Sequence, residues 1–443
     1  MTVGTLPLAA ERPAHDEPAR LLGGLHPDGA TVELSEHLAR WGALDLGPAR
    51  TRLVAELEAS GLSGRGGAAF PVGAKWRSVG TRGRPVVVAN GAEGEPASAK
   101  DATLLARTPH LVLDGASAAA TALGASRVLA YVPAHLAPGL ERAVEGRERI
   151  GLDPVPVEIV VAPDAFIAGQ ESAVVNAVAG RGAVPAFQGL TPIRHRGVGG
   201  RPTLVQNVET LAHVALVARF GARWFRGVGT EDAPGTALLT VTGRFESPVV
   251  LEAPLGTPLD RLLGLGPDAA DRYQGALLGG YGGTWVSLDT LGGLRFSEPA
   301  AQARAATLGP GVVVLLARRA CPLAEVARVV RYLHAQSAGQ CGPCVHGLFD
   351  LERAVDALAF GPRALGGRLE PVLDACALAE GRGACRHPDG VARFVTSACR
   401  VFSAEVAAHL GSGPCRSASA PGVLPVPGTR GSAAGRERPR WAR

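Results

Sequence analysis

Short apolar runs alternate with longer helix-like stretches over the first half of the chain. Residues 85–89, 127–132 and 155–161 are apolar runs of strand length, whereas residues 111–123 and 170–179 have the length and composition of helices. Strands that alternate with helices pair in parallel and bind ligands at their carboxyl ends. The pattern therefore predicts an α/β domain with a ligand site at that edge of its sheet.

The second half of the chain has two other patterns. Residues 237–243 and 249–253 flank a turn and predict a β-hairpin in a small β-rich domain. After residue 321, apolar residues recur every three or four positions and predict a helical bundle. The expected divisions are an N-terminal surface extension (1–45), an α/β domain (46–230), a β-rich domain (231–300), a helical domain (301–415) and a basic tail (416–443).

Charge is unevenly distributed along the 443 residues. The net charge is +5, and residues 416–443 alone hold six Arg and one Glu, so the rest of the chain is neutral. Because this basic segment is rich in Pro, Gly, Ser and Ala, we expect a disordered tail and no nucleic-acid binding. We see neither a long apolar run nor a secretory signal, so we expect a cytoplasmic protein without direct membrane insertion.

A glycine-rich segment, residues 61–76, is the first candidate site. Gly64, Gly66 and Gly67 lack a Cβ, so the backbone there can approach a phosphate closely. Two cations, Arg65 and Lys75, and one aromatic side chain, Phe70, accompany them. From these residues alone, a surface loop is the alternative.

Further polar segments follow the predicted strands. Asn90, Glu93 and Glu95 come after residues 85–89, where carboxylates suit ribityl or ribose hydroxyls better than phosphates. Two later segments are residues 169–172, which follow a strand and open a helix, and residues 203–210, whose amides and hydroxyls suit the carbonyls and ring nitrogens of a flavin. Helix capping is the alternative for each. The candidates there are Gly169, Gln170, Glu171, Gln206, Asn207 and Thr210.

Six of the seven cysteines lie between residues 341 and 415, these two included. Cys341 and Cys344 stand three apart in a predicted turn between helices, and two thiolates at this spacing can hold one metal centre. Cys376 or Cys385 could complete it. Inert buried thiols and a zinc site are the alternatives.

In this order, the motifs at residues 64–76, 202–210 and 339–344 resemble those of the 51-kDa family, the flavin- and NADH-binding subunits of NADH:quinone oxidoreductase. The likeness extends from about residue 61 to residue 402. It implies an α/β fold class with three parts: a Rossmann-like FMN domain, a small ubiquitin-like β domain and a C-terminal helical iron–sulfur domain that holds a [4Fe–4S] cluster.

The resemblance also implies roles. NADH, the substrate, would stack on the flavin with Phe70 near its adenine and Glu95 near a ribose. Electrons would pass to FMN, to the cluster and then to a redox partner, either a ferredoxin-like or thioredoxin-like [2Fe–2S] subunit or a membrane reductase, which would place the protein at the inner membrane. FMN would lie over the glycine-rich loop among Lys75, Asn90, Glu93, Gly169, Glu171 and Asn207.

Several positions depart from the family pattern. The first cysteine of its C-x-x-C-x-x-C motif aligns with Ala338. Cys385 lies 41 residues after Cys344, which matches the family's last gap, whereas Cys376 has the local sequence of the last ligand. If Cys376 and Cys385 both bind, four thiolates hold the cluster. Otherwise, the alternatives are a non-cysteine ligand such as His387 or a three-iron cluster. Residues that weaken the expected NADH contacts are Ser78, Ala92, Gln170, Gln188 and Thr191.

Two hypotheses follow. The first is an electron-transfer flavoprotein subunit that oxidises NAD(P)H through FMN. The alternative is a non-catalytic scaffold subunit of a redox assembly, with degenerate NADH and cluster sites.

Overall fold

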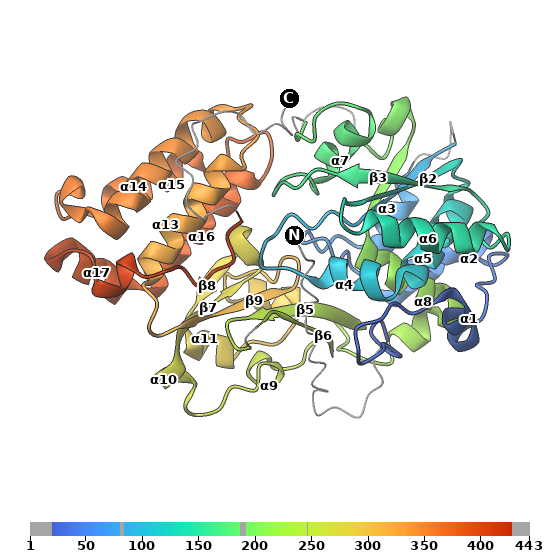
Figure 1. Cartoon of the computed structure of the whole chain (residues 1–443), viewed down its shortest axis with the longest axis horizontal. Coiled ribbons are helices and arrows are strands. Elements are labelled where there is room, and N and C mark those ends of the chain that lie inside the picture. The colour runs from blue at the N-terminus through green and yellow to red at the C-terminus, as the bar shows by residue number, and fades with distance from the viewer. Residues whose placement is uncertain (1–19, 80–83, 187–191, 246, 428–443) are drawn as a thin grey trace.

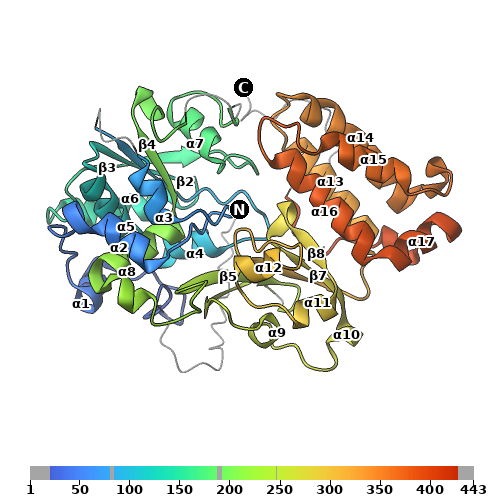
Figure 2. The same cartoon turned by 180° about the vertical axis from the view of Figure 1, so that it is seen from behind.

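The computed structural model describes residues 20–79, 84–186, 192–245 and 247–427. The chain folds into three parts, which Figure 1 shows from one side and Figure 2 from the other. An α/β part and a smaller mixed sheet lie against each other, and a bundle of helices stands at the opposite end from the α/β part. Among the described residues, no helix is both long and apolar enough to cross a membrane.

The α/β part is built on a parallel sheet in the order β3-β2-β1-β4. The predicted parallel sheet is confirmed, and β1, β2 and β3 begin and end within two residues of the expected positions, whereas β4 was not among the predicted strands. Because β4 lies on the opposite side of β1 from β2 and β3, the sheet reverses its winding between β1 and β4, where such folds open a ligand crevice. The strands are β1 (Val86–Asn90), β2 (Arg127–Pro133), β3 (Val157–Ala162) and β4 (Thr203–Asn207).

Helices cover both faces of this sheet. On one face, α2 (Ala49–Ser60), α5 (Pro109–Leu123) and α8 (Val208–Phe225) pack together over the alternate strand residues. Gly115 in α5 permits the close approach, because a Cβ there would lie 1.9 Å from the carbonyl oxygen of Leu211. The opposite face carries α7 (Glu171–Val178). The remaining helices of this part are α3 (Val72–Arg77), α4 (Lys100–Arg107), α6 (Ala137–Glu148) and η1 (Val198–Gly200).

Part of the expected N-terminal extension belongs to this core. Residues 34–41 form α1 (Leu34–Trp41), and His37 in it is 2% exposed. Its Nε2 lies 2.8 Å from a carboxylate oxygen of Asp114, which also binds Arg147 and Arg219. The expected surface extension thus contains a helix whose one buried side chain, His37, joins a buried ion cluster.

The second sheet has the order β6-β5-β9-β7-β8, with a parallel pair, β5 and β9, among antiparallel neighbours. This mixed order is that of ubiquitin-like folds, and the predicted hairpin is its β5–β6 pair. Since β9 supplies the central strand, the expected boundary at residue 300 falls inside this part, and the helical part begins after β9. The strands are β5 (Thr236–Thr242), β6 (Val249–Pro254), β7 (Tyr273–Leu278), β8 (Thr284–Val286) and β9 (Val312–Ala317); the helices are α9 (Leu259–Leu262), α10 (Ala269–Arg272), η2 (Gly280–Gly282), α11 (Leu288–Gly292) and α12 (Glu298–Gln302).

The predicted helical bundle is confirmed after β9. Its core joins the inner faces of four long helices and contains four cysteines. The helices are α13 (Pro322–Ala335), η3 (Pro343–Gly347), α14 (Leu348–Phe360), η4 (Pro362–Leu365), α15 (Glu370–Ala379), α16 (His387–Val401), α17 (Ser403–Ser412) and η5 (Arg416–Ser419).

The chain after α17 folds back onto this bundle. Leu424 is 3% exposed, and the buried Glu325 carboxylate accepts the N–H groups of Val423 and Leu424. The prediction of disorder is therefore wrong for residues 416–427. The composition of this segment does not show that Glu325 on α13 accepts hydrogen bonds from its backbone. Residues 428–443 lie outside the described part of the chain.

Candidate functional site

Three of the predicted motifs meet at the carboxyl edge of the parallel sheet. The last residues of β1 and β4, Asn90 and Asn207, lie opposite each other in register. Gly66 lies over Asn207, since a Cβ on this glycine would be 3.4 Å from the Asn207 Cβ. The Asn90 side chain donates to the carbonyl of Gly169 (2.9 Å). The edge at which the winding reverses is therefore surrounded by the glycine-rich loop and the loops after β1 and β3.

Lys75 provides a cation at this edge. Its Nζ donates to the carbonyl of Val205 in β4 (2.7 Å) and lies 3.1 Å from Glu171 at the start of α7. The Lys75 side chain is 25% exposed, so it remains accessible to an anion. Gln206, also a predicted ligand contact, instead accepts from the buried indole of Trp76 (3.2 Å) and fixes α3 against β4.

Arg65 points away from the edge. Its guanidinium donates to Ser63 Oγ and to the carbonyl of Thr236 in β5, both at 3.0 Å. Its backbone N–H donates to Thr210 Oγ1 (2.9 Å), a buried hydroxyl of α8. Both residues thus attach the glycine-rich loop to its surroundings, and the guanidinium of Arg65 is engaged by Ser63 and Thr236.

Several other candidate side chains accept hydrogen bonds from backbone N–H groups of the protein. Gln170 Oε1 accepts from the N–H groups of Ser172 and Ala173 and caps α7, so the capping alternative applies to it. Glu95 accepts from the N–H groups of Ala97 and Tyr281, and its burial raises its pKa to about 7.

Glu93 is held in the same way. Its carboxylate accepts from the N–H groups of Asp101 (3.2 Å) and Ala102 (3.0 Å) in the first turn of α4. Burial and the neighbouring Asp101 raise the pKa of Glu93. Ser98 donates its hydroxyl to the same carboxylate. These bonds shape the loop after β1 around the site.

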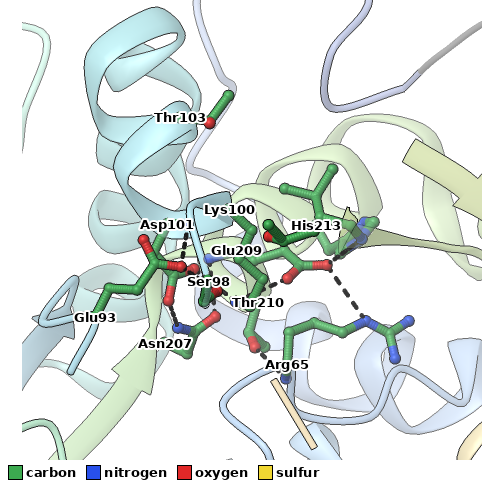
Figure 3. Close-up of polar contacts among 12 residues, drawn as sticks. Arg65, Glu93, Ser98, Lys100, Asp101, Thr103, Asn207, Glu209, Thr210 and His213 are labelled. Atoms are coloured by element: carbon green, nitrogen blue, oxygen red, sulfur yellow. Dashed lines mark hydrogen bonds and ion pairs between the residues drawn. The ribbon is translucent and has the colours of Figure 1, made fainter. Parts of the chain in front are cut away.

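A buried ionic network lies next to the edge and contacts Asn207 (Figure 3). Lys100 Nζ lies 2.7 Å from Asp101 and 2.9 Å from Glu209, and Lys100 and Glu209 are each 1% exposed. Burial opposes the charge on Lys100, but Asp101 and Glu209 outweigh it and raise its pKa. Asp101 accepts from Asn207 Nδ2 (2.7 Å), and Glu209 accepts from the N–H of Leu238 in β5 (2.8 Å).

This network fixes Asn207 and joins α4, α8 and β5. Sequence reasoning did not include Lys100 or Glu209 among the site residues. The available signal was a Lys-Asp pair directly after the turn that follows β1.

Two cavities adjoin the site. One, of about 330 Å³, lies between the glycine-rich loop and the second sheet, and Gly64, Arg65, Leu238 and Pro310 are among its lining residues. The other, of about 210 Å³, lies where the three parts meet. Its lining includes Ile167 and Gln170 of the α/β part, Tyr281 of the second part, and Cys385 and His387 of the helical part.

The loop after β3 links the sheet edge to the cysteine-bearing helices. The carbonyl of Gly169 accepts from Asn90, while Phe166 in the same loop donates its N–H to Gln336 (2.9 Å). The Phe166 ring lies 5.5 Å from the imidazole of His387, measured between ring centroids. One short loop therefore touches both candidate sites.

Three of the four predicted metal ligands, Cys341, Cys344 and Cys385, influence one another electrostatically. Burial raises the pKa of Cys344 to about 12, with Cys341 and Cys385 adding to it as neighbours. Burial, and also Cys341, raise the pKa of Cys385. The N–H of Cys344 donates to the carbonyl of Cys341 (3.0 Å), and Ala338 precedes this turn with 9% exposure.

Cys376 has other neighbours. Burial raises its pKa to about 11, and the groups that act on it are Thr396 of α16 and Glu380. Cys376 in turn raises the pKa of Cys399, again after burial as the main cause. The structure thus orients Cys376 toward α16, and none of the other three predicted ligands acts on its thiol.

This leaves three other residues that depart from the family pattern, and the candidate Phe70. Gln188 and Thr191 lie outside the described residues. Ser78 ends α3 and donates its hydroxyl to the carbonyl of Lys75 (2.7 Å). Phe70 is 55% exposed at the rim of the glycine-rich loop, where its ring is free to stack on a ligand.

A doubly wound α/β part, a ubiquitin-like part and a helical part with clustered thiols define the class of iron–sulfur flavoprotein subunits. Residues 57–216 match the family described as the Nuo51 FMN-binding domain, and residues 324–409 match the NADH-ubiquinone oxidoreductase-F iron–sulfur binding region. The chain belongs to this 51-kDa family of NADH-quinone oxidoreductase subunits. It is an oxidoreductase subunit that works with other subunits in a redox complex.

Relatives and solved structures agree with this assignment. The corresponding NADH-quinone oxidoreductase subunit of Mycobacterium tuberculosis (strain ATCC 25618 / H37Rv) is 32% identical over 377 residues, which cover 80% of this chain and 84% of the relative. One of the corresponding subunits of Rhizobium meliloti (strain 1021) is 30% identical over 415 residues, which cover 89% and 98%. The crystal structure of an NAD+-reducing [NiFe]-hydrogenase in the air-oxidised state matches with a TM-score of 0.73 and 29% identity, over 86% of this chain and 67% of that one.

Proposed function

We propose that this subunit takes electrons from NAD(P)H at the β1–β4 edge and passes them across the loop after β3 to a cluster held by the helical part. The observation that carries the proposal is the double contact of that loop, with Asn90 through Gly169 and with His387 through Phe166. FMN supplies the chemistry that joins a two-electron donor to a one-electron acceptor.

The residues at the sheet edge fit FMN. Gly66 leaves room for a ligand over Asn207, and Gly67 has a φ of +98°, a conformation that favours glycine. We assign the phosphate to this loop and to Lys75, the accessible cation. Asn90 and Asn207 offer neutral amides to the ring and the ribityl chain, and the network under Asn207 fixes the orientation of its amide.

For the nicotinamide substrate, the chain offers fewer contacts. We assign the exposed ring of Phe70 to the adenine. Glu95 is engaged by the N–H groups of Ala97 and Tyr281, so a ribose hydroxyl must share an oxygen that already accepts a bond. Gln170 is engaged in capping α7. We therefore expect slow or weak reduction by NADH.

The helical part fits a cluster held by three thiolates. Cys341, Cys344 and Cys385 are mutual neighbours, and we leave Cys376 out of the ligand set because it faces Thr396 and Cys399. His387 donates Nε2–H to the carbonyl of Leu333 (2.8 Å), which leaves its Nδ1 with a free lone pair. We therefore expect a cluster with three cysteine ligands. Its fourth ligand is either this imidazole or absent.

The electron acceptor is a partner protein in this proposal, either a [2Fe–2S] subunit of ferredoxin-like or thioredoxin-like type or a membrane reductase. Apolar side chains near the cysteine turn support docking there. Val345, which follows Cys344, is 47% exposed, and Leu378 on α15 is 53% exposed. Any attachment to the inner membrane would come through the partner.

Anaerobically purified protein tests the proposal. We expect a visible spectrum with both flavin and iron–sulfur absorption, and stopped-flow mixing with NADH or NADPH should bleach the flavin before the cluster signal changes. A colourless, folded protein would instead favour the scaffold alternative, which Ala338 and the capping role of Gln170 support. Bleaching at micromolar NADH with fast kinetics would show that the altered contacts do not weaken the donor site.

A further inference from the structure

A second group of metal-type ligands lies outside the proposed cluster site. Cys321 precedes α13, His409 lies in α17, and Cys415 lies in the chain that follows α17. One donor atom from each, Sγ, a ring nitrogen and Sγ, lies within 4.8 Å of the other two, and no other such group of three occurs among the described residues. Cys321 Sγ is 3.7 Å from His409 Nε2.

The imidazole is oriented as a metal ligand would be. His409 is 1% exposed, and its Nδ1 lies 3.2 Å from the carbonyl oxygen of Leu358. A carbonyl can only accept, so Nδ1 carries the proton and Nε2 presents its lone pair toward the sulfurs. A histidine that donates from one nitrogen to a backbone carbonyl and binds metal with the other is the usual arrangement in protein metal sites.

The spacing fits a small tetrahedral ion. Bonds of about 2.3 Å to sulfur and about 2.0–2.1 Å to nitrogen set a sulfur and a nitrogen on one zinc ion roughly 3.5 Å apart. The 3.7 Å between Cys321 Sγ and His409 Nε2 is close to that value. We propose that Cys321, His409 and Cys415 bind one divalent, thiolate-preferring metal ion, Zn²⁺ in particular, with water as its fourth ligand.

Charge balance supports a Cys₂His set. When the ion binds, both thiols release their protons to solvent, and two thiolates with a neutral imidazole cancel the double positive charge. A neutral centre suits Cys321, which is 3% exposed. Cys415 is exposed, so water can reach the fourth position.

One backbone contact has to give way. The N–H of Cys415 points at His409 Nε2 (3.2 Å) and occupies the lone pair that the ion would take. Cys415 lies in an exposed stretch between α17 and η5, so a small shift of its amide releases the nitrogen. Cys321 Sγ also accepts from the N–H of Ala324 (3.4 Å), a bond that a thiolate strengthens.

The site would anchor the chain that follows it. Beyond Cys415, the N–H groups of Val423 and Leu424 bind Glu325, and the carbonyl of Pro425 accepts from Tyr281 Oη (2.7 Å). Tyr281 lines the cavity between the α/β and helical parts. A metal at Cys415 therefore fixes the segment that braces this tyrosine, although it takes no part in the electron path.

Metal analysis of the full chain with its cofactors tests this site. Protein purified anaerobically with reductant should contain about one zinc per chain, and the zinc X-ray absorption edge should fit two sulfur and one nitrogen neighbours. Cys415→Ser should lower zinc affinity by roughly 100-fold or more, since even the outer partners of a ligand contribute 10–100-fold. Iron content should be unchanged, and amide exchange in residues 415–427 should become faster.

Ser419→Ala is the matched control, because Ser419 lies in the same segment and its hydroxyl donates to the carbonyl of Arg416, away from the three ligands. It should retain both the zinc and the slow exchange. The proposal is overturned if the reduced wild type binds no zinc, if Cys415→Ser binds it as tightly, or if zinc is lost from Cys341→Ser instead. A Cys321–Cys415 disulfide that persists under the same reducing conditions would also overturn it.

Discussion

The sheet edge and the helical bundle position their functional atoms in different ways. At the edge, Asn90 and Asn207 end neighbouring strands in register, so backbone pairing alone brings them opposite each other. In the bundle, the rotation of each helix decides where a thiol points. Cys376 and Cys385 are nine residues apart in sequence, yet Cys376 faces Thr396 and Cys399 while Cys385 joins Cys341 and Cys344. A motif on paired strands therefore predicts neighbours more directly than a motif on packed helices.

The largest expected effect separates these two cysteines. Cys344→Ser should abolish most of the bound iron and the low-temperature EPR signal of the cluster, because it removes one of three clustered thiolates. Cys376→Ser, the matched control, should keep both signals. If both variants lost the same amount of iron, Cys376 would also be a cluster ligand, which would contradict its exclusion from the ligand set.

The next effect concerns the sheet edge. The double variant Gly66→Val with Lys75→Ala should contain less than about a tenth of the wild-type flavin, because it fills the space over Asn207 and removes the accessible cation. Arg77→Ala is the control, since Arg77 lies on the same helix but is exposed and pairs with Glu58. Flavin content is read from the absorbance of the released cofactor. Full flavin in the double variant would place the phosphate elsewhere.

A third effect measures the network beneath the edge. Lys100→Met leaves the carboxylates of Asp101 and Glu209 without their shared cation, and such a loss in a buried pair costs about 3–5 kcal/mol. Arg127→Met breaks an exposed pair with Glu158 and should cost about 0–1 kcal/mol. Thermal melting of both variants compares them. If the Lys100→Met variant had the same melting temperature as the Arg127→Met control, the network would not stabilise the edge.

The smallest effect depends on pH. The pKa of Glu95 is raised to about 7 by burial, so between its unfolded value and pH 7 the folded chain holds a proton that the unfolded chain has lost. Folding stability from this group is therefore lost as pH rises through that window, by about 1–2 kcal/mol after allowance for its partial exposure. Glu95→Gln should flatten the fall in melting temperature from pH 5 to pH 8. Parallel pH profiles in the two proteins would contradict this shift.

The sequence by itself determined the three-part order and the edge at which the ligand motifs meet. Alternating apolar runs predict a parallel sheet, and the end of a parallel strand is a definite place, so Asn90 and Gly169 could be assigned to one edge. The family resemblance added Asn207 to that site. The glycine-rich loop was found because glycine there serves a backbone need that no other residue meets. Ala338 was visible as a missing thiol only by comparison with the cysteine motif of the family that the chain resembles.

The tertiary structure alone decided which side chains are free. Arg65 turns to Thr236, Gln170 caps its own helix, and Glu95 binds the N–H of Tyr281, 186 residues away. Sequence spacing cannot reveal such partners, because each bond depends on the packing of distant elements. For the same reason, the sequence does not show that Cys321, His409 and Cys415 lie close together. It also does not show that residues 416–427 fold onto α13, although their composition predicts disorder.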